Sequence, residues 1–168
     1  MKTVSHNQIL SYFESLAIAH TLIDGFYRYN WEEIKSALKY KVKADKFVCL
    51  MESHAGRIDQ PGTSPLNRRT VSLLFLKTCQ PGDYDGQNNT LDTSEQILLD
   101  FVARIQEDSK NLRHDSPLRW LRGFDINSCA YDNGGPLFIN MYGYNLIIEL
   151  PGTADVCYDD DVKARFGV

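Results

Sequence analysis

The sequence predicts an α+β fold, in which an antiparallel or mixed sheet carries two main helices packed on one face. Two segments repeat apolar residues at helical spacing, over residues 9–23 and 97–105. Each is followed by two β-prone runs, and the second pair of runs encloses an Asn-Gly turn signal. No linker, repeat or low-complexity tract interrupts this order. We therefore expect a single domain over 1–168, with about 159–168 as a loose acidic tail.

The first helix is predicted from its N-terminal capping box, in which Ser5 is followed three residues later by Gln8. Its apolar face comprises Ile9, Leu10, Phe13, Leu16, Ala17 and Ile23. Gly25 is placed to end the helix. His20 falls on the apolar face, so we expect it to be a partly buried, hydrogen-bonded histidine.

The segment 26–43 leaves two interpretations open: a short helix capped by Asn30 and Glu33, or an ordered surface excursion. Residues 46–52 follow as a strand with apolar residues on both faces. The breaker-rich residues up to Pro65 predict a loop, and 69–78 predict a second strand. Apolar residues alternate to both sides of this second strand, which indicates a central position and pairing with 46–52.

The second helix is predicted to begin at a cap, either Asp92 with Glu95 or Thr93 with Gln96. Its apolar face is Ile97, Leu98, Phe101, Val102 and Ile105. Residues 132–135 then predict a tight β-turn, followed by a long strand over 137–150. Tyr142, Tyr144, Leu146, Ile148 and Leu150 share its packed face, and Asn145 and Glu149 lie on the other.

The net charge and the absence of targeting signals limit the classes of partner and the locations that we expect for this protein. The net charge is −4 and the pI about 5.5, which argues against unaided nucleic-acid binding. Basic clusters at 35–46 and 113–122 leave a local phosphate contact open. No signal peptide or membrane-length apolar run is visible, so we expect no membrane partner and a cytoplasmic location, or a place in a virion or tail-like particle.

The four cysteines, Cys49, Cys79, Cys129 and Cys157, form no close pair. They fit small buried hydrophobic residues in a reducing compartment, while two disulfides with three alternative pairings stay open. No cysteine–histidine spacing suits zinc.

One loop pattern resembles a cation site: Asp83, Asp85, Gly86, Asn88 and Asn89 space oxygen-bearing side chains as calcium loops do. An EF-hand needs other residues at its fifth, sixth and twelfth positions, so a polar turn that feeds a helix cap is the competing interpretation. No cofactor and no metal are therefore assigned.

Two histidines stand near carboxylates, His54 near Glu52 and His114 beside Asp115. A general base also needs an orienting partner and a nucleophile or water in a pocket, which adjacency in the chain does not supply. An enzyme that uses these histidines or the 83–89 loop is one hypothesis, but no catalytic residue is assigned.

The overall layout resembles small phage- and prophage-derived tail-completion, or tail-terminator, proteins. The resemblance is carried by the helix Phe13-x-x-Leu16-Ala17-x-Ala19-His20-x-x-Ile23, then 26–29, the strand 47–52, and the later stretch 144–158. It implies a non-enzymatic structural subunit that forms a ring, commonly six-fold, on the end of a tail tube.

The expected partners are other copies of the chain or other tail and assembly proteins. A ring needs two unlike patches that meet. The candidate contact surface is Asp83, Asp85 and Asn88 in one loop, with Asn140, Asn145 and Glu149 on the last strand. The alternative function is a module that binds a small molecule or nucleic acid beside the sheet, suggested by the tyrosines and by 113–122.

Overall fold

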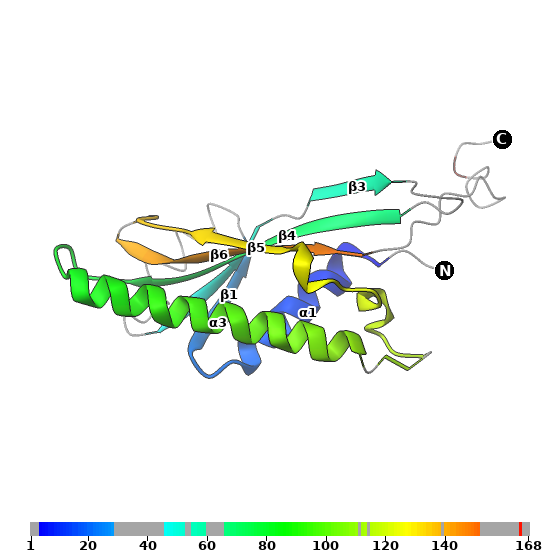
Figure 1. The fold of residues 1–168 in the computed structure, drawn as a ribbon, viewed down its shortest axis with the longest axis horizontal. Helices are drawn as coiled ribbons and strands as arrows, with labels where there is room; N and C mark the ends of the chain where they lie inside the picture. Colours follow the sequence, from blue (N-terminus) through cyan, green and yellow to red (C-terminus); the bar gives the residue numbers. More distant parts are fainter. Residues whose placement is uncertain are drawn as a thin grey trace.

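A computed structural model describes residues 4–28, 46–52, 55–59, 66–110, 112–113, 115–138, 140–151 and 165. The elements, in chain order, are α1 (His6–Ala19), β1 (Ile23–Arg28), β2 (Phe47–Met51), β3 (Ala55–Asp59), β4 (Leu66–Thr78), α3 (Tyr84–Lys110), η1 (Arg119–Leu121), η2 (Ile126–Ser128), β5 (Cys129–Asn133) and β6 (Met141–Leu150). The predicted α+β class is confirmed, because α1 and α3 lie on the same side of one sheet (Figure 1).

The described residues form a sheet of six strands in the order β1-β2-β4-β6-β5, with β3 paired to β4 beside this path. β1 and β2 run parallel and the other pairs are antiparallel, so the sheet is mixed. β4 is central, as predicted. It pairs with β6 along one edge, and with β2 and β3 one after the other along its second edge.

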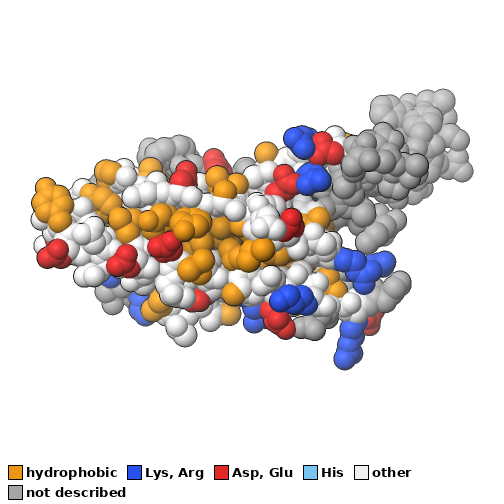
Figure 2. Space-filling view, in the orientation of Figure 1, with side chains coloured by type: hydrophobic (Ala, Val, Ile, Leu, Met, Phe, Trp, Pro, Cys, Tyr) orange, Lys and Arg blue, Asp and Glu red, His pale blue; other side chains and the backbone are white. Residues whose placement is uncertain are grey.

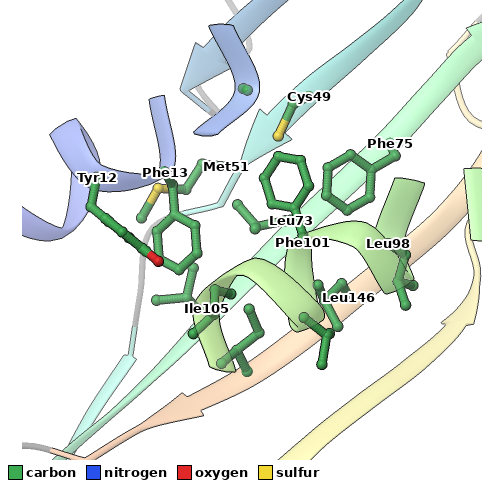
Figure 3. Close-up of a cluster of buried hydrophobic side chains, with 14 of the residues drawn as sticks. Tyr12, Phe13, Cys49, Met51, Leu73, Phe75, Leu98, Phe101, Ile105 and Leu146 are labelled. Carbon is green, nitrogen blue, oxygen red and sulfur yellow. The ribbon is translucent and has the colours of Figure 1, made fainter. Parts of the chain in front are cut away.

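The main core fills the space between the two helices and the sheet. Phe13 of α1 and Phe101 of α3 point into it, and the ring centroids of Phe75 and Phe101 lie 4.7 Å apart at 62° (Figure 3). The predicted apolar face of α3 is confirmed, since Ile97, Leu98, Phe101, Val102 and Ile105 are all buried. Such edge-to-face aromatic contacts add stability beyond the burial of area.

The opposite face of the sheet carries a second, smaller apolar cluster: Val48, Leu50, Leu74, Leu76 and Met141. Partly buried side chains of Tyr27, Leu137 and Phe138 pack against it. All five residues of β2 are buried, which confirms that this strand is covered on both faces.

A buried hydroxyl connects α3 to strands β4 and β6. Ser94, fully buried, donates to the carbonyl of Phe75 at 2.8 Å and accepts from the Tyr144 N–H at 2.9 Å. Gly143, beside this junction, lets the strands approach closely, because a Cβ there would stand 1.8 Å from the Phe75 carbonyl oxygen.

The capping box of α1 is confirmed: the Ser5 hydroxyl accepts from the Gln8 N–H, and the Gln8 side chain accepts from the Ser5 N–H. The predicted end of the helix is wrong. α1 stops at Ala19, and Ile23 and Gly25 belong to β1. Pairing with β2 in parallel register outweighs the helical spacing that Ile23 continues.

The start of α3 also differs from the prediction. The helix begins at Tyr84, about two turns before the predicted caps at Asp92 and Thr93. The Asp83 carboxylate accepts from the Gly86 N–H at 2.9 Å, as a capping side chain does. The preceding turn closes through a bond from the Asp83 N–H to the Gln80 carbonyl, with Gly82 at a φ of +82°.

Two loop predictions need correction. Residues 55–59 form β3 rather than loop, because they pair with β4 over Leu66–Thr70. This β3–β4 arm extends beyond the helical layer in Figure 1. The tight turn at 132–135 is also wrong: Asp132 and Asn133 lie in β5, and residues 134–140 connect it to β6.

Several predictions concern residues outside the described ranges: the short helix capped by Asn30 and Glu33, the histidines at 54 and 114, and most of the acidic tail.

Candidate interaction surfaces

Four of the six predicted contact residues lie at the end of the molecule where α3 begins. Asp83, Asp85 and Asn88 occupy the start of the helix, and the Asn140 carbonyl accepts from the Cys79 N–H at 2.9 Å just before it. Between the two aspartates, Tyr84 is 74% exposed. We call Asp83, Tyr84, Asp85, Asn88 and Asn140 the α3 tip. It presents an exposed aromatic ring flanked by two carboxylates.

The α3 tip does not have the geometry of a calcium loop. Asp85, Gly86, Asn88 and Asn89 are helical, and the Asp83 carboxylate is engaged in capping. Within the described ranges, no group of three or more His, Cys, Asp or Glu side chains is arranged to hold a metal ion. The polar turn that feeds a helix cap is therefore the better account of this sequence pattern.

The other two predicted contact residues lie elsewhere. Asn145 accepts from the Ser72 hydroxyl at 2.6 Å, on the sheet face opposite the helices. Glu149 lies eight residues beyond Met141 along β6, roughly 26 Å from the tip end of that strand at 3.3 Å per residue. Asn140 has a φ of +57° in the connection before β6, so it is not on the polar face of the strand as predicted.

Glu149 belongs to a charged cluster at the base of the β3–β4 arm. It pairs with the Arg68 guanidinium, whose Nε also lies 3.2 Å from Oδ2 of Asp59. Arg57 lies 2.7 Å from the same Asp59 oxygen. The charges of these side chains neutralise one another. The cluster is therefore better explained as a set of ion pairs that joins β3, β4 and β6 than as a free charged surface.

A groove separates α1 from α3 and η1. Its larger part holds about 520 Å³ and is lined by Tyr12, Trp120 and Asp108, among others. A smaller part of about 210 Å³ continues past His20, and the two share Leu16 and Arg104. The volume is that of small-molecule sites, and the lining mixes aromatic and hydrogen-bonding groups.

Polar contacts fix the walls of this groove. The Tyr12 hydroxyl donates to Asp108 at 2.9 Å, and the Arg104 Nε donates to both oxygens of that carboxylate. Burial, with the neighbouring charge of Asp108, raises the pKa of Tyr12 well above its usual range. Tyr12 is therefore a neutral donor, and the terminal nitrogens of Arg104 are not used by Asp108.

His20 matches its prediction of a hydrogen-bonded, partly buried side chain. Its Nδ1 accepts from the Leu22 N–H at 3.3 Å, and its Nε2 lies 3.3 Å from Asp100. With Nδ1 used as the acceptor, Nε2 carries the proton and donates to Asp100. This arrangement ties the end of α1 to α3 and leaves neither ring nitrogen free to act as a base.

Three cysteines fall in the described ranges and all are free thiols. Cys49 is fully buried, and burial raises its pKa far above the ordinary value. Cys79 is buried and donates to the Thr90 hydroxyl at 3.1 Å, and Cys129 is half-buried. The expectation of small buried hydrophobic residues therefore fits Cys49 and Cys79 well.

A further surface, the α3–β5 face, was not predicted from the sequence. It consists of the outer edge of β5 with three large exposed apolar side chains, Leu99 at 49%, Tyr131 at 49% and Ile126 at 46%. Figure 2 shows apolar side chains as a band across the side of the molecule that carries α3 and β5. Exposed apolar surface of this kind commonly marks an interface.

The charge of α3 and the segment after it changes sign along the chain. Residues 83–103 contain five acidic side chains and no Lys or Arg, whereas 104–122 contain five Lys or Arg and three acidic side chains. In Figure 2, acidic side chains lie along the half of the face where α3 begins, and most of the basic ones lie near its end. Asp85 in the first turn of α3 and Lys110 in its last turn complement the helix dipole, and the separation of charge along the chain makes the face electrically polar.

Sequence reasoning missed the residues that stand out most in the structure. Tyr84 lies inside a segment that the sequence predicts to be a turn. Leu99 lies on the polar side of α3 and leaves the helical spacing of the apolar face unchanged, so the pattern does not single it out. Trp120 becomes a groove wall only because η1 folds back on Tyr12, with the two rings 5.4 Å apart. The only available signal was an apolar residue at a position predicted to be solvated.

No protein-family model, curated protein sequence or solved structure matches this chain. In the part of the chain that the structure describes, no helix has both the length and the apolar character to cross a membrane.

Proposed function

We propose that this chain is a non-enzymatic structural subunit that works by binding copies of itself or other assembly proteins. The observation that carries the proposal is the α3 tip, where Tyr84 stands 74% exposed between Asp83 and Asp85. Tyrosine is enriched at interface hot spots because it contributes a large apolar area and a hydroxyl together. An aromatic side chain left this exposed has no packing role within the described fold.

The charge distribution suggests how such contacts form. The acidic tip lies at one end of α3, and Lys110, Arg113, Arg119 and Arg122 follow at the other end. A head-to-tail contact would place the tip of one copy against the basic end of the next. Contacts between unlike patches generate rings when the rotation closes. A ring on the end of a tail tube is the form that the resemblance to tail-terminator proteins suggests.

Light scattering on the purified chain tests this proposal. We expect an oligomer that weakens as salt is raised, because exposed charges are screened beyond about 8–10 Å at physiological ionic strength. Tyr84→Ala should break it into smaller species, because it removes the head-to-tail contact. Ile18→Ala is the matched control, since Ile18 is a large apolar residue, 72% exposed, on α1. A monomer at all concentrations that also fails to bind a tail-tube protein would contradict the proposal.

The α1–α3 groove favours a second candidate function, a module that binds a small polar ligand. Arg104, Trp120 and the Tyr12–Asp108 pair would supply charge, stacking and hydrogen bonds. Trp120 is one of only two tryptophans, so its fluorescence in a Trp31→Phe variant would report ligand binding directly. A screen of small polar metabolites that leaves this fluorescence unchanged would count against the groove as a ligand site.

A further inference from the structure

The outer edge of β5 has backbone groups to offer a partner. In the described part of the chain, β5 pairs with β6 on one side only, and residues 130–133 are exposed. A sheet edge of this kind presents unpaired N–H and C=O groups that another strand can complete.

The apolar side chains beside this edge are held in place. The Tyr131 hydroxyl donates to Glu95 of α3 at 2.8 Å, and its ring lies 5.7 Å from that of Tyr144 at 77°. Leu99 lies one turn after Glu95 on the same flank of the helix. The face therefore presents its apolar area in a fixed geometry, which lowers the entropic cost of binding.

The charges on α3 indicate what kind of partner fits. Asp92 and Lys110 are eighteen residues apart, which is five turns of 3.6 residues, so they project from the same side of the helix. Leu99 lies between them, close to their midpoint. A two-fold axis near Leu99 would bring Asp92 of each copy toward Lys110 of the other and would place the apolar residues at the centre.

We propose that the α3–β5 face binds a second copy of this chain, with the two β5 strands antiparallel about a two-fold axis. The path β1-β2-β4-β6-β5 of the described strands would then continue from β5 of one copy into β5 of the other. The proposal rests on the assembly role described above but uses a different surface, because a two-fold contact joins like with like whereas the α3 tip joins unlike patches.

The experiment uses the full chain with Tyr84→Ala, which removes the contact proposed at the α3 tip. Sedimentation equilibrium should give the mass of two chains. Adding Leu99→Asp should raise the dissociation constant about tenfold or more, because it places two carboxylates at the apolar centre. Ile18→Asp is the matched control and should leave the constant unchanged, since Ile18 is exposed on α1.

Charge exchange provides a second, independent arm. In the same Tyr84→Ala background, Lys110→Glu should weaken the dimer, and the double variant Asp92→Lys with Lys110→Glu should restore it. A purely structural role for either residue would not produce that restoration. In hydrogen exchange, the amides of β5 should also slow as the protein concentration is raised.

The outcomes separate this inference from the proposed function. A single-chain mass in the Tyr84→Ala background, or equal dissociation constants for Leu99→Asp and Ile18→Asp, would overturn the two-fold contact. Either result leaves the α3 tip to be judged by the oligomer of the unmodified chain. A dimer that forms normally, in a chain whose size does not respond to Tyr84→Ala, would support the inference and contradict the tip contact.

Discussion

Replacing Ser94 with alanine should destabilise the fold out of proportion to the single oxygen removed. The Ser94 hydroxyl is fully buried and serves both the Phe75 carbonyl and the Tyr144 N–H. Its loss removes two hydrogen bonds, each contributing about 0.5–1.5 kcal/mol net. It also leaves two backbone groups without this partner in the interior, where an unsatisfied group costs about 1–3 kcal/mol.

The expected loss is about 2–3 kcal/mol, because the strands can relax enough to recover part of the bonding. At this chain length, each kcal/mol lowers the melting temperature by roughly 2–4 °C, so the predicted fall is about 4–12 °C. Urea unfolding followed by circular dichroism would give the free energy directly, provided that the slope with denaturant is unchanged.

Ser109→Ala is the matched control. Ser109 is half-buried in the same helix and donates only to the Gln106 carbonyl, three residues earlier. Both substitutions gain the same helix propensity from alanine, so their difference isolates the junction with the sheet. Equal losses for Ser94→Ala and Ser109→Ala, within about 0.5 kcal/mol, would refute the reasoning.

Three further perturbations follow from buried groups. Tyr12 has a raised pKa and stays protonated in the fold, so the stability that it contributes is present below about pH 10 and is lost as the pH rises above that value. Tyr12→Phe should flatten the alkaline fall in unfolding free energy by up to about 1.4 kcal/mol per pH unit, and an unchanged slope would contradict this. Gly143→Ala should cost about 3 kcal/mol by urea unfolding, because the new Cβ overlaps the Phe75 carbonyl; a cost below about 0.5 kcal/mol would show that the strands separate freely. Native Cys49 should react with iodoacetamide far more slowly than half-buried Cys129, as mass spectrometry of quenched samples would show; equal rates would mean that the core opens readily.

The parts of the fold that were predicted correctly are those governed by neighbouring residues. The capping box at Ser5 works within one helical turn, and the two-sided burial around Leu74 follows from strand alternation. The predictions that are wrong concern segments whose structure depends on residues far away in the sequence. Ile23 continues a helical period but pairs with Phe47 of β2, and no local signal encodes that pairing.

The predictions of the candidate surfaces also fail where the role of a residue depends on the folded structure. Asp83 was singled out for the oxygen it contributes, and the structure uses that oxygen as a helix cap. Asn140 is predicted from the sequence to lie on the polar face of the last strand, but its positive φ belongs to the connection that precedes β6. The α3–β5 face combines residues from two helical segments and an edge strand, so its apolar band exists only after the chain has folded.

The β3–β4 arm implies that one strand has two levels of local stability. Over Val71–Leu76, β4 is covered by apolar side chains on both faces, whereas over Leu66–Thr70 it pairs with a strand whose Ile58 is 64% exposed. Amides of the inner part should exchange with deuterium only when the whole domain unfolds, while those of the arm should exchange through smaller openings. The boundary near Thr70 would then mark where the cooperative unit of the domain ends.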